Sequence, residues 1–174
     1  MKKLFCLLVS SLLTLTTFAQ TTYPITWTNA VEVSVSGNTI TKTGTSGYHN
    51  AGASSSNILA ANTDGWIEFT IDNFTAEKFF GFSDADTDVS HTTIDYAVST
   101  NGANQFAVRL NGMLTNNFTA AVGDVLRMER VGANMLVKRN GTVIHTINNV
   151  MVAPLKADAS INQNGGTITN ATCS

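Results

Sequence analysis

Hydrophobic and polar residues alternate with a period of two along short segments of the chain, and turn residues separate these segments. The longest such run is Gly123–Thr146, in which tight turns at 132–133 and 140–141 separate three alternating segments. A period of two is typical of a strand with one buried face. Asn140-Gly141 suits a two-residue hairpin, because both central positions need positive φ, which Asn and Gly tolerate. The run therefore predicts three antiparallel strands.

The same alternation recurs in most of the chain, and Gly, Asn, Asp and Ser clusters punctuate it about every 8 to 14 residues. No segment shows a sustained helical stripe, and the best helical candidate, 54–61, has room for at most one turn. Roughly a dozen short strands are expected. They require either two packed antiparallel sheets or a closed barrel, so the fold class is all-β. Trp27 and Tyr96 are expected in the core.

Residues 1–19 have the features of a secretory signal peptide. Lys2 and Lys3 precede an apolar stretch from 4 to 15, and Thr17-Phe18-Ala19 forms a small-x-small cleavage signal. The stretch is too short for a membrane-spanning helix, and no later segment approaches about 20 apolar residues. We therefore expect cleavage near Ala19, a secreted, cell-surface or periplasmic protein without a transmembrane segment, and a single domain over 20–174.

The charge balance argues against nucleic acid as a partner. Two of the ten basic residues fall in the predicted signal peptide, which leaves eight basic against twelve acidic residues. Binding to phosphate backbones needs clustered positive charge, which this chain lacks. Cys173 would be the single cysteine left after cleavage, so no internal disulfide is expected, and the thiol is either incidental or cross-links two chains.

An ordered series of motifs covers nearly all of the expected domain. The motifs are Trp27–Val31, Val35–Lys42, Asn50–Ser55, Asp64–Phe69, Phe80–Ser83, Ile94–Ala97, Gly123–Thr146, Pro154–Ser160 and Gly165–Thr169. The series resembles the concanavalin A-like lectin/glucanase (SPRY-like) sandwich module of secreted and cell-surface proteins of bacteria, of the type frequent in Bacteroidetes. The resemblance implies a jelly-roll-like sandwich of two antiparallel sheets.

Catalytic patterns are not found in the sequence. Glucanases of this fold carry Glu-x-Asp-x-x-Glu on one strand, and none of the four glutamates begins that pattern: Glu32, Glu68, Glu77 and Glu129. The serine run 54–56 lacks the Gly-x-Ser-x-Gly elbow of a nucleophile. The three histidines, His49, His91 and His145, lie in separate segments and are expected to face solvent. A hydrolase with unusual catalytic residues is therefore ranked last among the functions considered.

The leading hypothesis is a non-catalytic recognition module that binds carbohydrate or a surface polymer. A sugar ring needs an aromatic platform with polar partners beside it. Five residues are the candidates for ligand binding: Tyr48, His49, Asn50, Trp66 and Asp86. The alternative is a structural or adhesive surface protein that binds other proteins or itself. The charged residues of the hairpin run are expected to be solvent-facing spacers: Arg127, Glu129, Arg130, Lys138 and Arg139.

One acidic loop imitates a calcium site. Its carboxylates fall at positions 1, 3, 5 and 12 of a calcium-binding loop, with Asp84, Asp86 and Asp88 as the candidate ligands. Two features oppose calcium: position 6 is Val89 where such a loop needs glycine, and position 12, Asp95, belongs to a motif expected in a strand. The alternative is a solvated acidic loop in which Asp side chains cap the turn. No other cofactor is expected.

Overall fold

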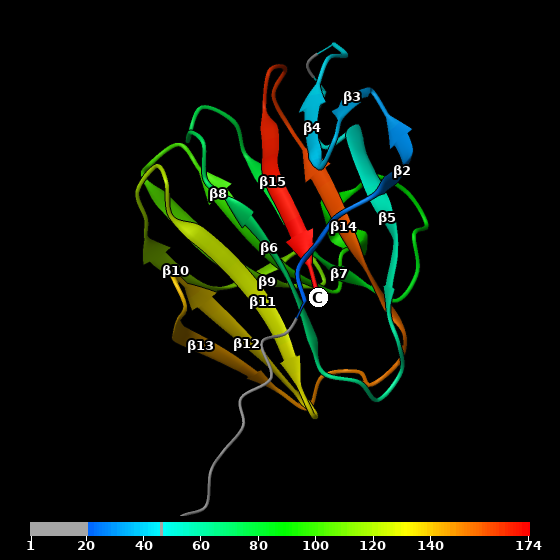
Figure 1. Ribbon diagram of the computed structural model, residues 1–174. Helices are drawn as coiled ribbons and strands as arrows, with labels where there is room; N and C mark the ends of the chain where they lie inside the picture. The colour runs from blue at the N-terminus through cyan, green and yellow to red at the C-terminus, as the bar shows by residue number, and fades with distance from the viewer. Residues whose placement is uncertain (1–20, 46) are drawn as a thin grey trace, which may run out of the picture.

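Two antiparallel β-sheets make up the protein in a computed structural model that describes residues 21–45 and 47–174 (Figure 1). The eight-stranded sheet has the order β13-β12-β11-β6-β15-β4-β3, with β1 also paired to β15. Its strands are β1 (Tyr23–Pro24), β3 (Val33–Ser36), β4 (Thr39–Lys42), β6 (Gly65–Thr70), β11 (Val125–Val131), β12 (Asn134–Arg139), β13 (Thr142–Asn148) and β15 (Thr167–Cys173). The predicted signal peptide lies outside the described residues.

The seven-stranded sheet has the order β10-β9-β8-β7-β14-β5-β2. Its strands are β2 (Trp27–Val31), β5 (Ala51–Leu59), β7 (Lys78–Ser83), β8 (Tyr96–Asn101), β9 (Gln105–Leu110), β10 (Met113–Thr119) and β14 (Leu155–Ile161). The C-terminal strands complete both sheets, because β14 lies between β7 and β5 and β15 lies between β6 and β4. The expected all-β sandwich is confirmed, and both sheets are open at their edges, unlike a barrel.

The core lies between the sheets, where alternate residues of each strand meet. Phe69 of β6 packs edge-on against Phe80 of β7, with ring centroids 5.2 Å apart. Leu126 and Met128 of β11 are fully buried in the same cluster, as the period-two pattern predicts. Trp27 and Tyr96 also belong to this cluster, so their expected place in the core is confirmed. The described residues contain no helix long and apolar enough to cross a membrane.

The segment 54–61, where at most one helical turn is expected, forms no helix. Most of it belongs to β5, whose serines form cross-strand hydrogen bonds; for example, the Ser55 hydroxyl accepts from the Ala157 amide at 2.9 Å. The one helical element in the described part of the chain is a 3₁₀ turn, η1 (His91–Thr93), which Ser90 caps by accepting from the Thr92 amide at 3.3 Å. Its three residues are too few to produce a periodic pattern in the sequence.

Arg130 corrects one prediction, because it is not a solvent-facing spacer but fully buried. Its guanidinium donates to the carbonyl oxygens of Thr63 at 2.8 Å and of Ala153 at 2.6 Å, and also to that of Ala60. These carbonyls come from the β5–β6 and β13–β14 connections. The planar guanidinium, with donors on three nitrogens, replaces water for all three oxygens and ties both connections to the end of β11.

Candidate functional site

The outer face of the seven-stranded sheet carries a cluster of polar and aromatic side chains. In β7, β8 and β9 the residues that alternate with the core point to this face, and they include Phe79, Ser99 and Arg109. The β7–β8 connection folds over part of the face, and Ile94 from this connection packs with Phe79 and Ala97 in a small apolar cluster separate from the main core. Part of the outer face is therefore covered by the β7–β8 connection, which Ile94 attaches to the sheet through its contacts with Phe79 and Ala97.

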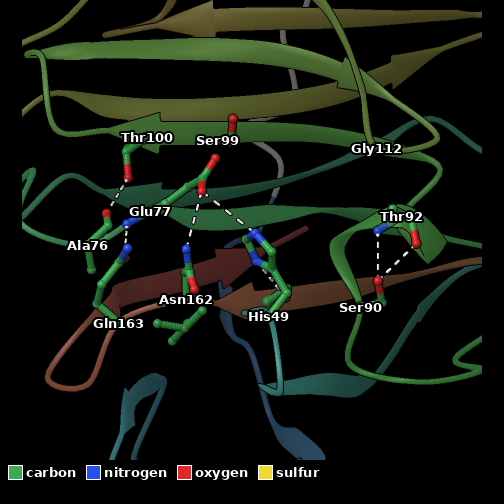
Figure 2. A network of polar contacts seen from close by, with 12 residues as sticks. His49, Ala76, Glu77, Ser90, Thr92, Ser99, Thr100, Gly112, Asn162 and Gln163 are labelled. Carbon is green, nitrogen blue, oxygen red and sulfur yellow. Dashed lines mark hydrogen bonds and ion pairs between the residues drawn. The ribbon is translucent and has the colours of Figure 1, made fainter. Parts of the chain in front are cut away.

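Glu77 lies at the centre of the polar network on this face (Figure 2). One carboxylate oxygen, Oε2, is 3.6 Å from Nε2 of His49, and the other, Oε1, is 3.7 Å from a guanidinium nitrogen of Arg109. The side-chain amide of Asn162 donates to Oε2 at 3.5 Å, and the Glu77 backbone amide donates to the Gln163 side chain at 2.6 Å. These five residues come from four separate segments of the chain, and we refer to them with Phe79, His91 and Tyr48 as the outer-face cluster.

Arg109 is held in place by more than its ion pair with Glu77. Its Nε donates to the Ser99 hydroxyl at 3.1 Å, and a terminal nitrogen donates to the Gly112 carbonyl at 3.4 Å. Its guanidinium carbon lies 5.2 Å from the centroid of the Phe79 ring, which is cation–π geometry. The orientation of the guanidinium is therefore fixed by contacts within the protein.

Four aromatic rings stack beside the network. The His49 ring lies 4.0 Å from the His91 ring and 4.9 Å from the Phe79 ring, centroid to centroid. Tyr48 covers this stack, 4.2 Å from His49 and 5.8 Å from His91. Tyr48 is 74% exposed whereas His49 is 4% exposed. The prediction that the histidines face solvent is therefore wrong for His49, because its ring fills the space between Tyr48 and Phe79.

Contacts within the outer-face cluster shift the pKa values of Glu77 and His91. The imidazole of His49 holds the pKa of Glu77 below its usual range, against the opposing effect of burial, and Arg109 adds to the lowering. Burial lowers the pKa of His91, and the nearby His49 and Arg109 lower it further. Nε2 of His49 and Nδ1 of His91 are both buried without a hydrogen-bond partner. At neutral pH the cluster therefore holds an ionised carboxylate and a neutral His91.

The five predicted ligand residues do not form one site. Tyr48 and His49 belong to the outer-face cluster, and Asn50 follows them as an exposed residue whose side-chain oxygen accepts from Lys42 Nζ at 2.5 Å. Trp66 lies on β6 of the other sheet, 4% exposed, with the Arg127 guanidinium 3.8 Å from its ring. Trp66, predicted as a ligand-binding residue, therefore offers no open ring face, because Arg127, itself paired with Glu68 at 2.7 Å, covers it.

The carboxylates of the β7–β8 connection bind protein donors. Asp86 Oδ2 accepts from Asn29 Nδ2 and from the Ser54 hydroxyl, both at 2.7 Å, which fastens the connection to the sheet. Asp88 Oδ1 accepts from the Ser90 amide at 2.7 Å. In the described part of the chain no three His, Cys, Asp or Glu side chains are arranged to hold a metal ion, and this includes Asp84, Asp86 and Asp88. The three carboxylates do not fit a calcium shell as they stand, so calcium binding would require the loop to rearrange.

A buried carboxylate lies on the same sheet face next to this connection. Asp158 of β14 is 2% exposed and accepts from the Ser83 hydroxyl at 2.7 Å. The pKa of Asp158 is raised to about 7. Burial is the main cause, the neighbouring Asp86 carboxylate adds to the rise, and the hydrogen bond from Ser83 opposes it. Asp158 is therefore close to half protonated at neutral pH.

Sequence reasoning missed most of the outer-face cluster. Phe79 and Arg109 lie in strands β7 and β9, and Glu77 and Asn162 directly flank β7 and β14, so these residues come together only in the folded sheet. The one signal available was a charged residue at an outward position between two core residues, as Arg109 is between Val108 and Leu110. That signal alone does not tell a site from an ordinary solvated strand position.

The comparisons with known proteins identify the fold. No family model and no curated protein matches the chain. Among solved structures, the carbohydrate recognition domain of Emp46p in metal-free form aligns with a TM-score of 0.56 at 10% identity, covering 84% of this chain and 87% of that one. The PSpry domain of TRIM65 aligns with a TM-score of 0.56 at 10% identity, covering 87% and 91%. Alginate lyase AlgAT5 of polysaccharide lyase family 7 aligns with a TM-score of 0.50 at 12% identity, covering 71% and 68%.

The protein thus has the fold of concanavalin A-like lectin and SPRY domains, as the sequence motifs predict. This fold is shared by recognition domains and by enzymes. The choice between these classes therefore depends on the side chains of this chain.

Proposed function

We propose that the protein binds carbohydrate on the outer face of the seven-stranded sheet, with Tyr48 as the stacking platform. The observation that carries the proposal is the contrast between Tyr48 and its neighbours. Its ring is 74% exposed, while His49, against which it packs edge-on, is buried and packs in turn against the buried Phe79. A large aromatic ring held in a fixed position yet left in water is the arrangement that the apolar face of a sugar ring requires.

Polar groups beside Tyr48 support the same proposal. Glu77 and Arg109 hold each other and are held in turn by Asn162 and Ser99, so their orientation is set in the free protein. A ligand hydroxyl can donate to the Glu77 carboxylate or accept from Arg109 without a further loss of side-chain freedom. The fold is compatible with this role, since the neighbours with solved structures include carbohydrate recognition domains.

The cluster favours binding without cleavage. Hydrolysis of glycosides usually needs two carboxyl groups, one of them a general acid with a raised pKa. The outer-face cluster holds one carboxylate, Glu77, and His49 lowers its pKa instead. Asp158 on the same sheet face has a raised pKa, but it is 2% exposed and bound to Ser83, so it is out of reach of a sugar. Ser160 contacts His49 Nδ1 at 3.4 Å, but its hydroxyl is fully buried and donates to the Val89 carbonyl at 2.7 Å, so it is not available as a nucleophile.

A glycan array with the wild type and two single variants tests the proposal. Tyr48→Ala should lower affinity for the glycans bound by the wild type about tenfold, the equivalent of roughly 1.4 kcal/mol. Tyr23→Ala is the matched control, because Tyr23 is also an exposed tyrosine but lies on the other sheet. Absence of binding by the wild type, or equal loss in both variants, would contradict the site. Release of reducing ends or unsaturated sugars from the bound glycans would contradict the non-catalytic role.

A specific observation also favours the second candidate function, self-association. Strand β10 forms one edge of the seven-stranded sheet, carries no charged residue and exposes the side chains of Met113 and Leu114. Edge strands without charges or proline are templates for pairing with another chain. Sedimentation velocity of the wild type and of Leu114→Lys tests this role. We expect the wild type to form a dimer and Leu114→Lys to be monomeric. A wild type that stays monomeric at millimolar concentration would refute self-association.

A further inference from the structure

A cavity of about 150 Å³ lies between the two sheets, far in the fold from the outer-face cluster. Its buried walls come from both layers. Ile67 and Cys173 belong to β6 and β15 of the eight-stranded sheet, and Phe82, Leu155 and Ala157 belong to β7 and β14 of the other. We call it the inter-sheet cavity.

Two of the side chains that line the cavity are small. Ala157 and Cys173, one from each sheet, are the smallest apolar side chains of the lining and leave space between the layers. Protein interiors are close-packed, and voids larger than a water molecule are few, since the lining atoms of a void lose their dispersion contacts. An apolar cavity of roughly 150 Å³ is large enough to take benzene. The volume therefore sets the size of an occupant at one six-membered ring or a short alkyl chain.

The mouth of the cavity is accessible from solvent. Tyr23 and Ile58 line it and are both more than half exposed, which gives a ligand a route. The polar residues near the mouth are Asn57 and Ser174, whereas Ser55 is buried and its hydroxyl accepts from the Ala157 amide and donates to the Asn57 carbonyl. Of the described residues that line the cavity, none has a charged side chain. An anion would lose its hydration here without gaining a counter-charge, which is costly.

We propose that the inter-sheet cavity is a binding site for a small, non-anionic molecule with an apolar ring or short alkyl chain. The apolar part lies between Ala157 and Cys173, and a polar group such as a hydroxyl lies at the mouth near Asn57 and Ser174. Cys173 serves here as wall, not as reactant, since burial raises the pKa of its thiol and keeps it protonated. The site is independent of carbohydrate binding at Tyr48.

Methyl NMR titration with benzyl alcohol tests the proposal, with benzoate as an anionic analogue of nearly the same shape. Benzyl alcohol should shift the methyl resonances of Ile67 and Leu155 saturably. It should leave those of Ile94, which packs against Phe79 on the outer face, in place. Benzoate should produce no saturable shift. No shift at Ile67 and Leu155, or an equal response to the two probes, would overturn the proposal.

Two cavity-filling variants complete the test. Ala157→Leu fills the space from the seven-stranded sheet, and Cys173→Val fills it from the other sheet, so at least one is expected to fold with native methyl dispersion. The folded variant should bind benzyl alcohol about tenfold more weakly or worse, while Tyr48→Ala should bind it as the wild type does. Unchanged affinity in a folded filling variant would overturn the site.

Discussion

The Asp158 carboxylate accepts a 2.7 Å hydrogen bond from the Ser83 hydroxyl inside the structured outer face of the seven-stranded sheet. Asp158 is 2% exposed, and the neighbouring Asp86 carboxylate is fixed by Asn29 and Ser54. Two acidic side chains are thus kept close together under the β7–β8 connection. Burial, aided by the repulsion from Asp86, raises the pKa of Asp158 to about 7.

We expect Asp158 to make the protein less stable as the pH rises. Its unfolded pKa is near 3.8 and its folded pKa about 7, so between these values the unfolded chain releases a proton that the folded chain retains. The free energy of unfolding should therefore fall by about 4 kcal/mol through this window and stay level above it. Asp158→Asn should remove this dependence and gain stability at pH 8, measured by urea denaturation from pH 4 to 8. An unaltered pH dependence in Asp158→Asn would refute the assignment.

Arg130 should be among the least replaceable side chains of the protein. Arg130→Met keeps much of the apolar volume but leaves the carbonyls of Ala60, Thr63 and Ala153 without their donor. These are three partly buried hydrogen bonds from a charged donor, and losing them should cost roughly 3–5 kcal/mol in urea denaturation. Arg139→Met is the control, because Arg139 is only partly buried, and it should cost less than about 1 kcal/mol. Equal losses in the two variants would contradict the role of Arg130.

The strands were predictable because their pattern is local. Leu126 and Met128 show the period of two within five residues, and burial of one face of the sheet follows directly. Arg130 is in phase with them, so alternation by itself places it on the inner face. Its charge argued for solvent, and that reasoning failed because three carbonyls replace water, and no property of Arg130 in the sequence announces those partners.

The candidate site was predictable only in part for the same reason. Tyr48 is exposed and lies in a turn, both of which follow from its neighbours in the sequence. His49 is buried by contacts to Glu77, Phe79 and His91, which lie 28 to 42 positions further along the chain. Such contacts depend on how β5, β7 and β14 are ordered in the sheet, and strand order is not encoded in local periodicity.

With the acidic loop folded as in this structure, calcium should have little effect on the stability of the protein. Asp86 and Asp88 already accept hydrogen bonds from Asn29, Ser54 and Ser90, and calcium would have to displace these donors. We expect the melting temperature of EDTA-treated protein to change by less than about 1 °C at millimolar Ca²⁺, because binding that weak adds little to stability. A rise of several degrees that Asp86→Asn abolishes would show that the loop rearranges into a calcium site.

Gly81 is required where β7 passes β8. A Cβ added there would lie 1.9 Å from the Tyr96 carbonyl oxygen, a backbone atom that cannot move without disturbing the strand. Gly81→Ala should therefore destabilise the protein by about 3 kcal/mol. Gly102→Ala is the matched control, since its Cβ would meet the Phe74 carbonyl oxygen at an ordinary 3.7 Å and should change stability by no more than about 1 kcal/mol. Thermal and urea denaturation of the two variants would show whether the difference exists.

Glu77 should produce a pH dependence opposite to that of Asp158. His49, together with Arg109, lowers the folded pKa of Glu77 below its unfolded value of 4.5, so its stabilising effect is present above that pH and is lost as the pH falls through the folded pKa. Glu77→Gln should cost about 1 kcal/mol at pH 7 and less at pH 3, since the charge contribution of Glu77 is lost as the pH falls through its folded pKa. Urea denaturation of Glu77→Gln, Asp158→Asn and the double variant at both pH values separates the two effects. If Glu77→Gln cost as much at pH 3 as at pH 7, its contribution would come from packing and not from charge.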